Sequence, residues 1–267
     1  MRKYVLGLAG VFVIVFALTS MSWNSTSKAL PVVGKLNPTV TADLEYNAYI
    51  NNIYTTAQLA QYGLAKQVFE KAVTGFYNLK ISGKIAEDKS VLSIADFDQS
   101  STKKRLWIID LAKKELLLNS WVAHGQHSGA DKPTHFSNVN NSYQSSIGFY
   151  VTGEIYTGQH GRSLRLDGMD EGFNSNARKR AIVIHGASYV GQGTINALGR
   201  LGRSQGCPAV APELANTVID AIGGKTVLFI NVSDVGYSSK YLNENLAAQL
   251  ANNLFGNEKT LDTASSI

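Results

Sequence analysis

The segment Gly202-Arg203-Ser204-Gln205-Gly206-Cys207-Pro208-Ala209 contains the only cysteine of the 267-residue chain. A lone thiol cannot form an internal disulfide, and an unpaired cysteine in an oxidising compartment is a liability unless its reactivity is used. His185 ends an apolar run 22 positions earlier (207 − 185). The pair is typical of a nucleophile and its base. The alternative is an inert thiol packed as a small hydrophobe, but such cysteines usually lie in apolar runs, and this one is flanked by glycine and proline.

The sequence around the pair predicts how the thiol would be activated. A histidine within hydrogen-bond reach, with a cation such as Arg203 nearby, would favour the thiolate. Gly186 follows His185, so a backbone carbonyl here would orient the ring nitrogen that faces away from sulfur. The alternative for His185 is a hydrogen-bonded histidine of the core.

The nucleophile loop also offers donors for an oxyanion. Pro208 has no N–H, so the donors would be the amides of Gln205, Gly206 or Cys207. Gly206 would also let a substrate carbonyl approach closely. Ser204 belongs to the same loop.

The first residues predict export. Arg2 and Lys3 precede fourteen uncharged, mostly apolar residues, 5–18, and polar sequence follows. This pattern is typical of a signal peptide or, if it continues to Trp23, of an uncleaved membrane anchor. We expect residues 1–23 to be a signal peptide or N-terminal anchor and residues 24–40 to be a polar tether.

The composition predicts an ordinary folded domain after the leader, with 44% hydrophobic and 17% charged residues. The net charge of +5 suits a protein that works against an anionic surface or polymer. Lysine and arginine are scattered, however, and no basic and aromatic pattern of a nucleic-acid binder occurs, so no nucleic-acid partner is expected.

Periodicity divides the rest of the chain into helical and strand-rich parts. Apolar residues recur at helical spacing within 41–84, and Gly63 breaks the pattern, which predicts a helical pair. We expect strands at 105–110, 116–122, 147–152, 163–166, 181–185 and 226–232, and one helix from Pro212 to a stop at Gly223-Gly224. Residues 85–233 would form the β-rich domain. Leucines at 242, 246, 250 and 254 predict a C-terminal helix in 234–267, followed by a flexible tail.

Five motifs in order carry a resemblance to a known family. They are Arg105 to Leu111, Ala123-His124-Gly125, Ser145 to Tyr150, His160 to Leu166, and Gly202 to Ala209. With these motifs, the stretch 93–231 resembles the catalytic domain of the murein L,D-transpeptidases, which are YkuD-like proteins. The resemblance implies an α+β fold with a β-rich, sandwich-like catalytic domain of mixed sheets, here preceded by the small helical pair.

The resemblance also implies an activity and a place. Cys207 matches the nucleophile, His185 the base and Gly186 the residue whose carbonyl orients the base. The cysteine would attack a peptidoglycan stem peptide after the L-centre of diaminopimelate and release D-alanine. An amine, from a second stem peptide or a protein lysine, would resolve the thioester in the bacterial periplasm or cell envelope. No cofactor is implied.

Two departures from the family pattern concern the acceptor side. The larger family has Ser-His-Gly-Cys where this chain has Ser204-Gln205-Gly206-Cys207, so a second imidazole is lost. The interval from histidine to cysteine is also longer than usual, which predicts a longer loop, 187–201, that could act as a lid with Gly191, Gly193 and Gly199 as hinges.

Polar residues of the motifs are candidates for substrate contacts. We expect these from Arg203, His160, Arg165, Tyr150 and His124. Arg162, Arg165 and Arg203 would anchor a carboxylate of the stem peptide, or else form surface charges or a salt bridge to Asp167 or Asp170.

Three other functions are consistent with parts of the sequence. A carboxypeptidase or endopeptidase would hydrolyse the same bond. A secreted zinc hydrolase would gather His124, His127, His135 and His160 with Asp131, although a two-residue gap between histidines is a weak ligand signal and no metal is expected. A peptidoglycan-binding module would have no need of a free reactive thiol.

Overall fold

The computed structural model describes residues 38–233 and 236–245, with side chains from residue 44. The predicted leader, the tether as far as residue 37 and the C-terminal helix beyond residue 245 lie outside the described residues. None of the helices in the described ranges is both long and apolar enough to cross a membrane.

Two helices precede the sheet, as the periodicity predicts. Helix α1 spans Pro38–Thr56 and α2 spans Lys66–Ile81. The connection contains Gly63 at φ +75°, a left-handed conformation that glycine adopts without strain. Three of the predicted tether residues, 38–40, are already helical.

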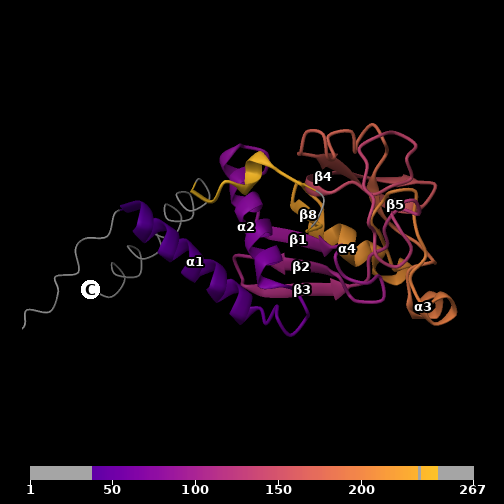
Figure 1. Cartoon of the computed structure of the whole chain (residues 1–267), viewed down its shortest axis with the longest axis horizontal. Coiled ribbons are helices and arrows are strands. Elements are labelled where there is room, and N and C mark those ends of the chain that lie inside the picture. Colours follow the sequence, from indigo (N-terminus) through magenta and orange to yellow (C-terminus); the bar gives the residue numbers. More distant parts are fainter. Residues whose placement is uncertain (1–37, 234–235, 246–267) are drawn as a thin grey trace, which may run out of the picture. The chain divides into compact units, whose positions relative to one another are not determined.

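One mixed sheet of eight strands forms the rest of the fold (Figure 1), in the order β3-β2-β1-β8-β4-β5-β6-β7. Its strands are β1 Val91–Asp96, β2 Leu106–Asp110, β3 Glu115–Ser120, β4 Gly148–Gly158, β5 Gly161–Gly168, β6 Val183–Gly186, β7 Ala209–Val210 and β8 Val227–Asn231. The pairs β1–β8 and β6–β7 are parallel and the others antiparallel. The α+β, β-rich fold class is therefore confirmed.

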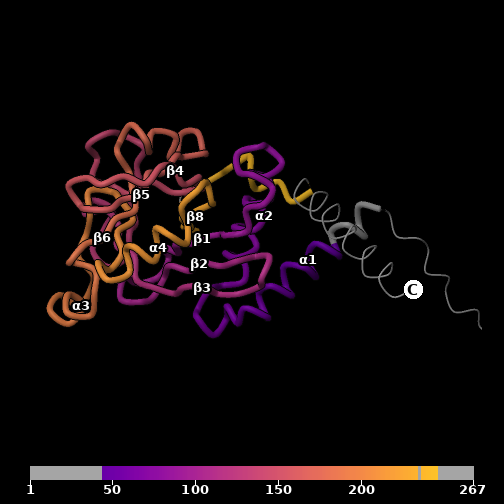
Figure 2. Tube along the Cα trace, turned by 180° about the vertical axis from the view of Figure 1, so that it is seen from behind, coloured from indigo at the N-terminus to yellow at the C-terminus, as the bar shows by residue number. Residues whose placement is uncertain are grey.

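The sheet carries an apolar core on each face. On one face, α1 and α2 cover Ile94, Trp107 and Phe229. On the other, the sheet curves around α4 (Ala215–Ile222), which packs Val218 and Ile222 against β1, β5 and β6. Figure 2 shows α4 from behind, between β1 and β6. Because the helical pair shares a core with the sheet, it belongs to the same compact unit.

Three short helices complete the described chain. They are α3 Gln192–Leu198, the 3-10 helix η1 Pro212–Leu214 directly before α4, and the 3-10 helix η2 Lys240–Leu242. The predicted helix from Pro212 to Ile222 is thus η1 plus α4, and Gly223 follows it as expected. The predicted loop 187–201 is not structureless, because α3 occupies its centre.

The last described segment is tied back to the domain by buried polar contacts. The Asp170 carboxylate accepts hydrogen bonds from Tyr237 Oη at 2.6 Å and Ser239 Oγ at 2.5 Å. Asn78 of α2 donates to the Tyr241 carbonyl at 2.7 Å, and the Tyr241 ring is buried in the core. These contacts hold η2 beside α2 (Figure 1).

Candidate active site

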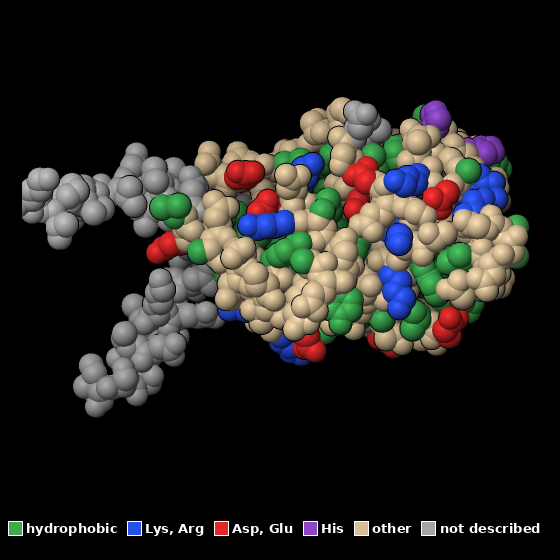
Figure 3. Space-filling view, turned by 60° about the horizontal axis from the view of Figure 1, so that its bottom comes forward, with side chains coloured by type: hydrophobic (Ala, Val, Ile, Leu, Met, Phe, Trp, Pro, Cys, Tyr) green, Lys and Arg blue, Asp and Glu red, His purple; other side chains and the backbone are tan. Residues whose placement is uncertain are grey.

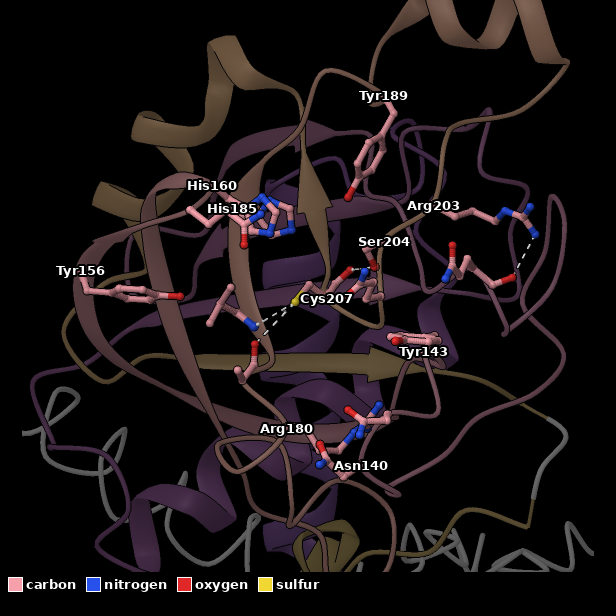
Figure 4. A pocket seen from close by; sticks show the side chains of 16 residues that line it. Asn140, Tyr143, Tyr156, His160, Arg180, His185, Tyr189, Arg203, Ser204 and Cys207 are labelled. Carbon is pink, nitrogen blue, oxygen red and sulfur yellow. Dashed lines mark hydrogen bonds between the residues drawn. The ribbon is translucent and has the colours of Figure 1, made fainter.

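A pocket of about 480 Å³ opens beside β6, and Cys207 and His185 both line it (Figure 4). Its other walls come from the β4–β5 hairpin, the loop 140–143, the turn before β6 and the nucleophile loop. Tyrosine, asparagine, glutamine, histidine and arginine dominate the lining. Within the described part of the chain, no aspartate or glutamate lines it, so the pocket suits an anionic or neutral ligand.

Backbone strain concentrates at this pocket. Six non-glycine residues of the described chain have a positive φ, and three of them, Asn141, Tyr143 and Ala181, line the pocket. Such conformations persist only where the surrounding structure enforces them, and they cluster at functional sites.

The nucleophile loop is closed on itself by Ser204. Its hydroxyl donates to the Cys207 carbonyl at 2.6 Å and accepts from the Gly206 amide at 3.0 Å. The Gly206 amide, one of the three expected oxyanion donors, is therefore already hydrogen-bonded in the free protein. The amides of Gln205 and Cys207 form no hydrogen bond with any residue that the structure describes.

Gly206 is required where it stands. Its φ is +121°, and a Cβ would lie 2.7 Å from the Gln144 carbonyl oxygen. Ser145 Oγ donates to the Gly206 carbonyl at 3.2 Å, so the residue is held on both sides. A side chain here would displace the loop that carries Cys207.

The thiol rests against the start of β6. Cys207 Sγ accepts from the Val183 amide at 3.4 Å and points its proton toward the Ala181 carbonyl at 3.7 Å. Burial raises the pKa of Cys207 above its ordinary value, although the Val183 N–H and the Arg180 charge oppose this. The expected thiolate is thus not favoured in the free protein.

The cation beside the thiol is Arg180, not Arg203 as the sequence suggested. Arg180 donates to the carbonyls of Ser137 and Gln144, both at 2.6 Å, and ties the loop 137–144 to the turn before β6. Arg203 lines the same pocket, where its Nη1 donates to the carbonyls of Gln126 and Gly129.

His185 is buried at the end of β6, and its ring is oriented as expected. Its Nδ1 lies 3.0 Å from the Gly186 carbonyl oxygen. A carbonyl only accepts, so Nδ1 carries the proton and Nε2 of the neutral ring has the free lone pair. A Cβ on Gly186 would lie 3.0 Å from the Ala215 Cβ, so glycine lets β6 pack closely against α4. No hydrogen bond joins His185 to the thiol in the described structure.

A second imidazole lies on the base. His160, in the turn of the β4–β5 hairpin, stacks on His185 with ring centroids 4.3 Å apart (Figure 4). Burial and the His160 charge lower the pKa of His185, and the Gly186 carbonyl opposes them. His185 therefore stays neutral down to a lower pH than a free histidine does, and a general base must be neutral to accept a proton.

The family follows from the sequence of this region. The family model for the L,D-transpeptidase catalytic domain matches residues 60–231, from before α2 to the end of β8, including Cys207 and His185. The chain belongs to the L,D-transpeptidase catalytic domain family. Members of this family modify peptidoglycan.

Solved structures that resemble this chain share little sequence with it. An L,D-transpeptidase from Mycobacterium smegmatis is 12% identical, with a TM-score of 0.35 over 54% of this chain and 59% of that one. The helical cell shape determining protein Pgp2 from Campylobacter jejuni is 14% identical, with a TM-score of 0.39 over 67% and 63%. The chain matches less than two thirds of the length of either. No curated protein sequence matches it.

Three predicted substrate residues of this L,D-transpeptidase domain do not line the pocket. Tyr150 and His124 are both fully buried, and the Tyr150 hydroxyl is hydrogen-bonded to Ser146. Arg165 pairs with Glu154 at 2.9 Å and lies over the Tyr156 ring at 4.4 Å, so it supports a pocket residue from outside. These three side chains therefore lie outside the pocket lining in this structure, whereas His160, Arg203, Gln205 and Ser204 do line the pocket.

The salt-bridge partners also differ from those expected. Arg162 pairs with Asp220 of α4 at 2.5 Å. Asp167 pairs with Arg178, and Asp170 serves the C-terminal segment described above.

The histidines of the metal hypothesis are not gathered into one site. The His127 ring packs against Tyr143, and His135 is hydrogen-bonded to Thr134. The Asp131 carboxylate accepts hydrogen bonds from the Ser100 and Ser101 hydroxyls. Over residues 38–233 and 236–245, no three His, Cys, Asp or Glu side chains are placed to hold a metal ion.

The predicted lid is docked at its base. The Gly202 amide donates to the Tyr189 carbonyl at 2.9 Å, and Val190 and Leu201 are buried together. Gly199 ends α3 at φ +68°. The Tyr189 side chain faces the pocket (Figure 4), and burial raises its pKa to about 12, so the phenol stays neutral.

Sequence reasoning did not single out most of the other pocket residues, among them Tyr143, Tyr156, Arg180 and Tyr189. Two of these four left some signal, because Tyr156 lies between two of the motifs and Arg180 directly precedes the predicted strand 181–185.

The sequence predicts scattered lysine and arginine residues. Figure 3 shows basic and acidic side chains interspersed on the face in view.

Proposed function

We propose that this domain is a cysteine-dependent L,D-transpeptidase that acts on peptidoglycan stem peptides, with Cys207 as nucleophile and His185 as base. The observation that carries the proposal is the shared pocket, in which the Gly186 carbonyl holds the His185 tautomer with a free Nε2. The thiol and the imidazole come together because β6 and β7 pair in parallel, with His185 opposite Ala209, two residues after Cys207.

In the acylation step, the thiol starts as a neutral group, in line with its raised pKa. Nε2 of His185 takes the proton as sulfur attacks the carbonyl carbon after the L-centre of diaminopimelate. The S–C bond forms, the C–N bond to D-alanine breaks, and the proton passes from His185 to the leaving amine. This step requires the ring and the thiol to come into contact once substrate is bound.

The developing oxyanion needs donors that the fold does not already use. Of the three amides considered, Gly206 is bonded to Ser204, so Gln205 and Cys207 remain. Preorganised amides of this kind stabilise a tetrahedral intermediate without reorganisation. We assign them this role.

In the second step, an amine attacks the thioester. The new C–N bond forms as the C–S bond breaks, and the amine proton passes through His185 back to sulfur. Gln205 stands where the larger family has a histidine, so the nucleophile loop supplies no second imidazole. His160, which stacks on His185, provides one instead, and we assign it to contact the acceptor. Arg203 retains its Nη2 and Nε donors, which suit a stem-peptide carboxylate. Hydrolysis of the same thioester is the alternative outcome.

Export to the periplasm or cell envelope, through a signal peptide or an N-terminal anchor in residues 1–23, belongs to the same proposal. It rests on the basic and apolar pattern of the first residues and on the substrate, which lies outside the cytoplasm.

The test uses a tetrapeptide muropeptide as donor and mass spectrometry of the products. We expect dimers joined between diaminopimelate residues, or adducts with an added amine such as a lysine peptide, in excess of free tripeptide. Cys207→Ala should abolish turnover and labelling by iodoacetamide or a carbapenem, and EDTA should have no effect. Turnover that survives in Cys207→Ala contradicts the nucleophile, and tripeptide alone at high acceptor concentration makes the enzyme a carboxypeptidase.

A further inference from the structure

Arg105 is a buried cation on which the Asp131 and Asp96 carboxylates act through their charge without forming an ion pair. Its side chain is fully buried and lies over the Phe97 ring at 4.8 Å. It donates to the carbonyls of Gln99 and Val122 and to His124 Nδ1, the last at 2.8 Å, and no ion pair forms with it in the ranges that the structure describes. Burying a charge that has no ion-pair partner costs free energy, and hydrogen bonds offset only part of that cost, so the presence of Arg105 calls for a role beyond stability.

His124 connects this cation to the next turn of the chain. A guanidinium only donates, so His124 Nδ1 is the acceptor and Nε2 carries the proton. Nε2 faces the Gly129 carbonyl oxygen at 3.4 Å. Burial and the Arg105 charge lower the pKa of His124 to about 4, so the ring is neutral at working pH. Both ring nitrogens are hydrogen-bonded, and the side chain does not line the pocket. His124 is therefore not placed to exchange a proton with a substrate.

The backbone beside His124 holds the nucleophile loop. The Ser204 amide donates to the His124 carbonyl at 2.9 Å, and the Gln126 amide donates to the Ser204 carbonyl at 2.7 Å. The loop and the segment 124–126 therefore run side by side, with Gly125 opposite Ser204. A Cβ on Gly125 would lie 2.9 Å from the Gly206 Cα, so the two chains are in close contact.

Gly129 provides a second connection between His124 and the nucleophile loop. Its carbonyl, which faces His124, also accepts from Arg203 Nη1 at 2.8 Å. Arg203 and Ser204 are consecutive residues. The nucleophile loop is therefore held both by the backbone hydrogen bonds of Ser204 and by the side chain of Arg203. Ser204 in turn sets the Gly206 amide and the Cys207 carbonyl.

We propose that Arg105 and His124 are positioning residues that set the direction of the Gln205 and Cys207 amides through Ser204. The role rests on the proposed cysteine chemistry but involves no direct contact with substrate. It explains why these two polar residues, which lie in recognised motifs, are buried behind the pocket instead of lining it.

The experiment compares two reactions of the same thiol. Alkylation by iodoacetamide forms an S–C bond with loss of iodide and needs no oxyanion donor. Acylation by 4-nitrophenyl acetate forms a thioester with loss of nitrophenolate, passes through an oxyanion, and so depends on the amides. The ratio of the two rate constants measures amide placement separately from thiol reactivity.

We expect His124→Leu, which keeps bulk but removes both ring contacts, to lower the ratio of acylation to alkylation by about tenfold or more. His124→Gln, whose amide can accept from Arg105 and donate to Gly129, should restore the ratio to within about threefold of the wild type. If His124→Leu does not fold, His124→Asn replaces it, because its shorter amide cannot reach both partners, and the ratio should again fall.

Thr152→Val is the matched control. Thr152 is fully buried and its hydroxyl donates to the Ile222 carbonyl at 2.8 Å, in another part of the sheet. This variant should lose stability with an unchanged ratio. A wild-type ratio in His124→Leu or His124→Asn overturns the positioning role. A wild-type protein that acylates with the ester but not with muropeptides would overturn the proposed function and leave the positioning result intact.

Discussion

The two halves of the pocket are built in different ways. The base lies at the end of a paired strand, with one carbonyl contact at Gly186 and one stacked ring, His160. The nucleophile lies on an irregular loop that has no regular secondary structure from 202 to 206 apart from a single bridge at Ser204. It is fixed instead by hydrogen bonds to Ser204, Ser145 and the segment behind it.

The difference shows where each half is sensitive. A strand places a side chain through many repeated backbone bonds, so few individual residues are critical on the base side. A loop has only its specific contacts, so the nucleophile side should depend on individual small and polar residues. Substitutions on the two sides test this contrast.

The largest effect is expected from loss of the base itself. His185→Gln should lower the rate of acylation by about 10²- to 10⁴-fold, the usual contribution of a general base. The base acts in its neutral form, and its pKa is lowered, so the acid limb of kcat/KM for the wild type should lie below the ordinary histidine pKa of about 6.5. This limb should be absent from the variant.

The measurement is a pH profile of kcat/KM, with His135→Gln as control because His135 is exposed and outside the pocket. A wild-type limb at or above pH 6.5, or one that persists in His185→Gln, would identify another group as the base.

A single methyl group on the nucleophile side comes next. Gly206→Ala should lower kcat by about 10²-fold, because the Cβ would meet the Gln144 carbonyl and shift the loop. Gly172→Ala is the control, since Gly172 also has a positive φ, +78°, but open space around its Cβ. Steady-state kinetics and thermal melting of both variants separate loop displacement from backbone strain. Equal loss of activity in the two variants would contradict the clash.

The smallest effect tests the stacked ring. His160→Phe keeps a ring over His185 but removes the charge that lowers the pKa of His185. The acid limb should therefore move to higher pH, by less than about one unit. His160→Leu, which removes the ring as well, should also raise KM for the acceptor amine. If neither variant changes the profile or KM, His160 is only a surface residue of the hairpin.

Much of this architecture could be predicted from the sequence, because its signals are local. Periodicity predicted the helical pair and α4, and short apolar runs predicted six of the strands, although β4 continues to Gly158, beyond the predicted end at 152. That Cys207 and His185 share one site was predicted from the lone thiol and the histidine that ends an apolar run upstream, and both line the pocket. Strand β1 was missed because the polar residues Ser93 and Asp96, although buried, interrupt its short apolar run. Strand β7 was missed because it is only two residues long.

The site was harder to predict, because polar motif residues can either build a pocket or line it. His124 and Tyr150 have the chemistry of substrate contacts, yet both side chains are turned into the interior, Tyr150 from strand β4 and His124 from the segment after β3. Arg180 lies in a segment without periodicity, and only the folded turn brings it to the thiol. Burial of Cys207, which reverses the expected direction of its pKa shift, likewise depends on long-range packing.

The positions at which the chain enters and leaves the described unit have a consequence for reach. Helix α1 begins, and η2 ends, on the side of the sheet opposite to β6 and α3, where the pocket opens (Figures 1 and 2). The point at which the proposed N-terminal anchor would join the described unit, at Pro38, therefore lies on the side away from the pocket. Tension between the proposed anchor and a bound polymer would pass across the sheet, and the contacts of Asp170 and Asn78 hold the segment around η2 on the same side as Pro38.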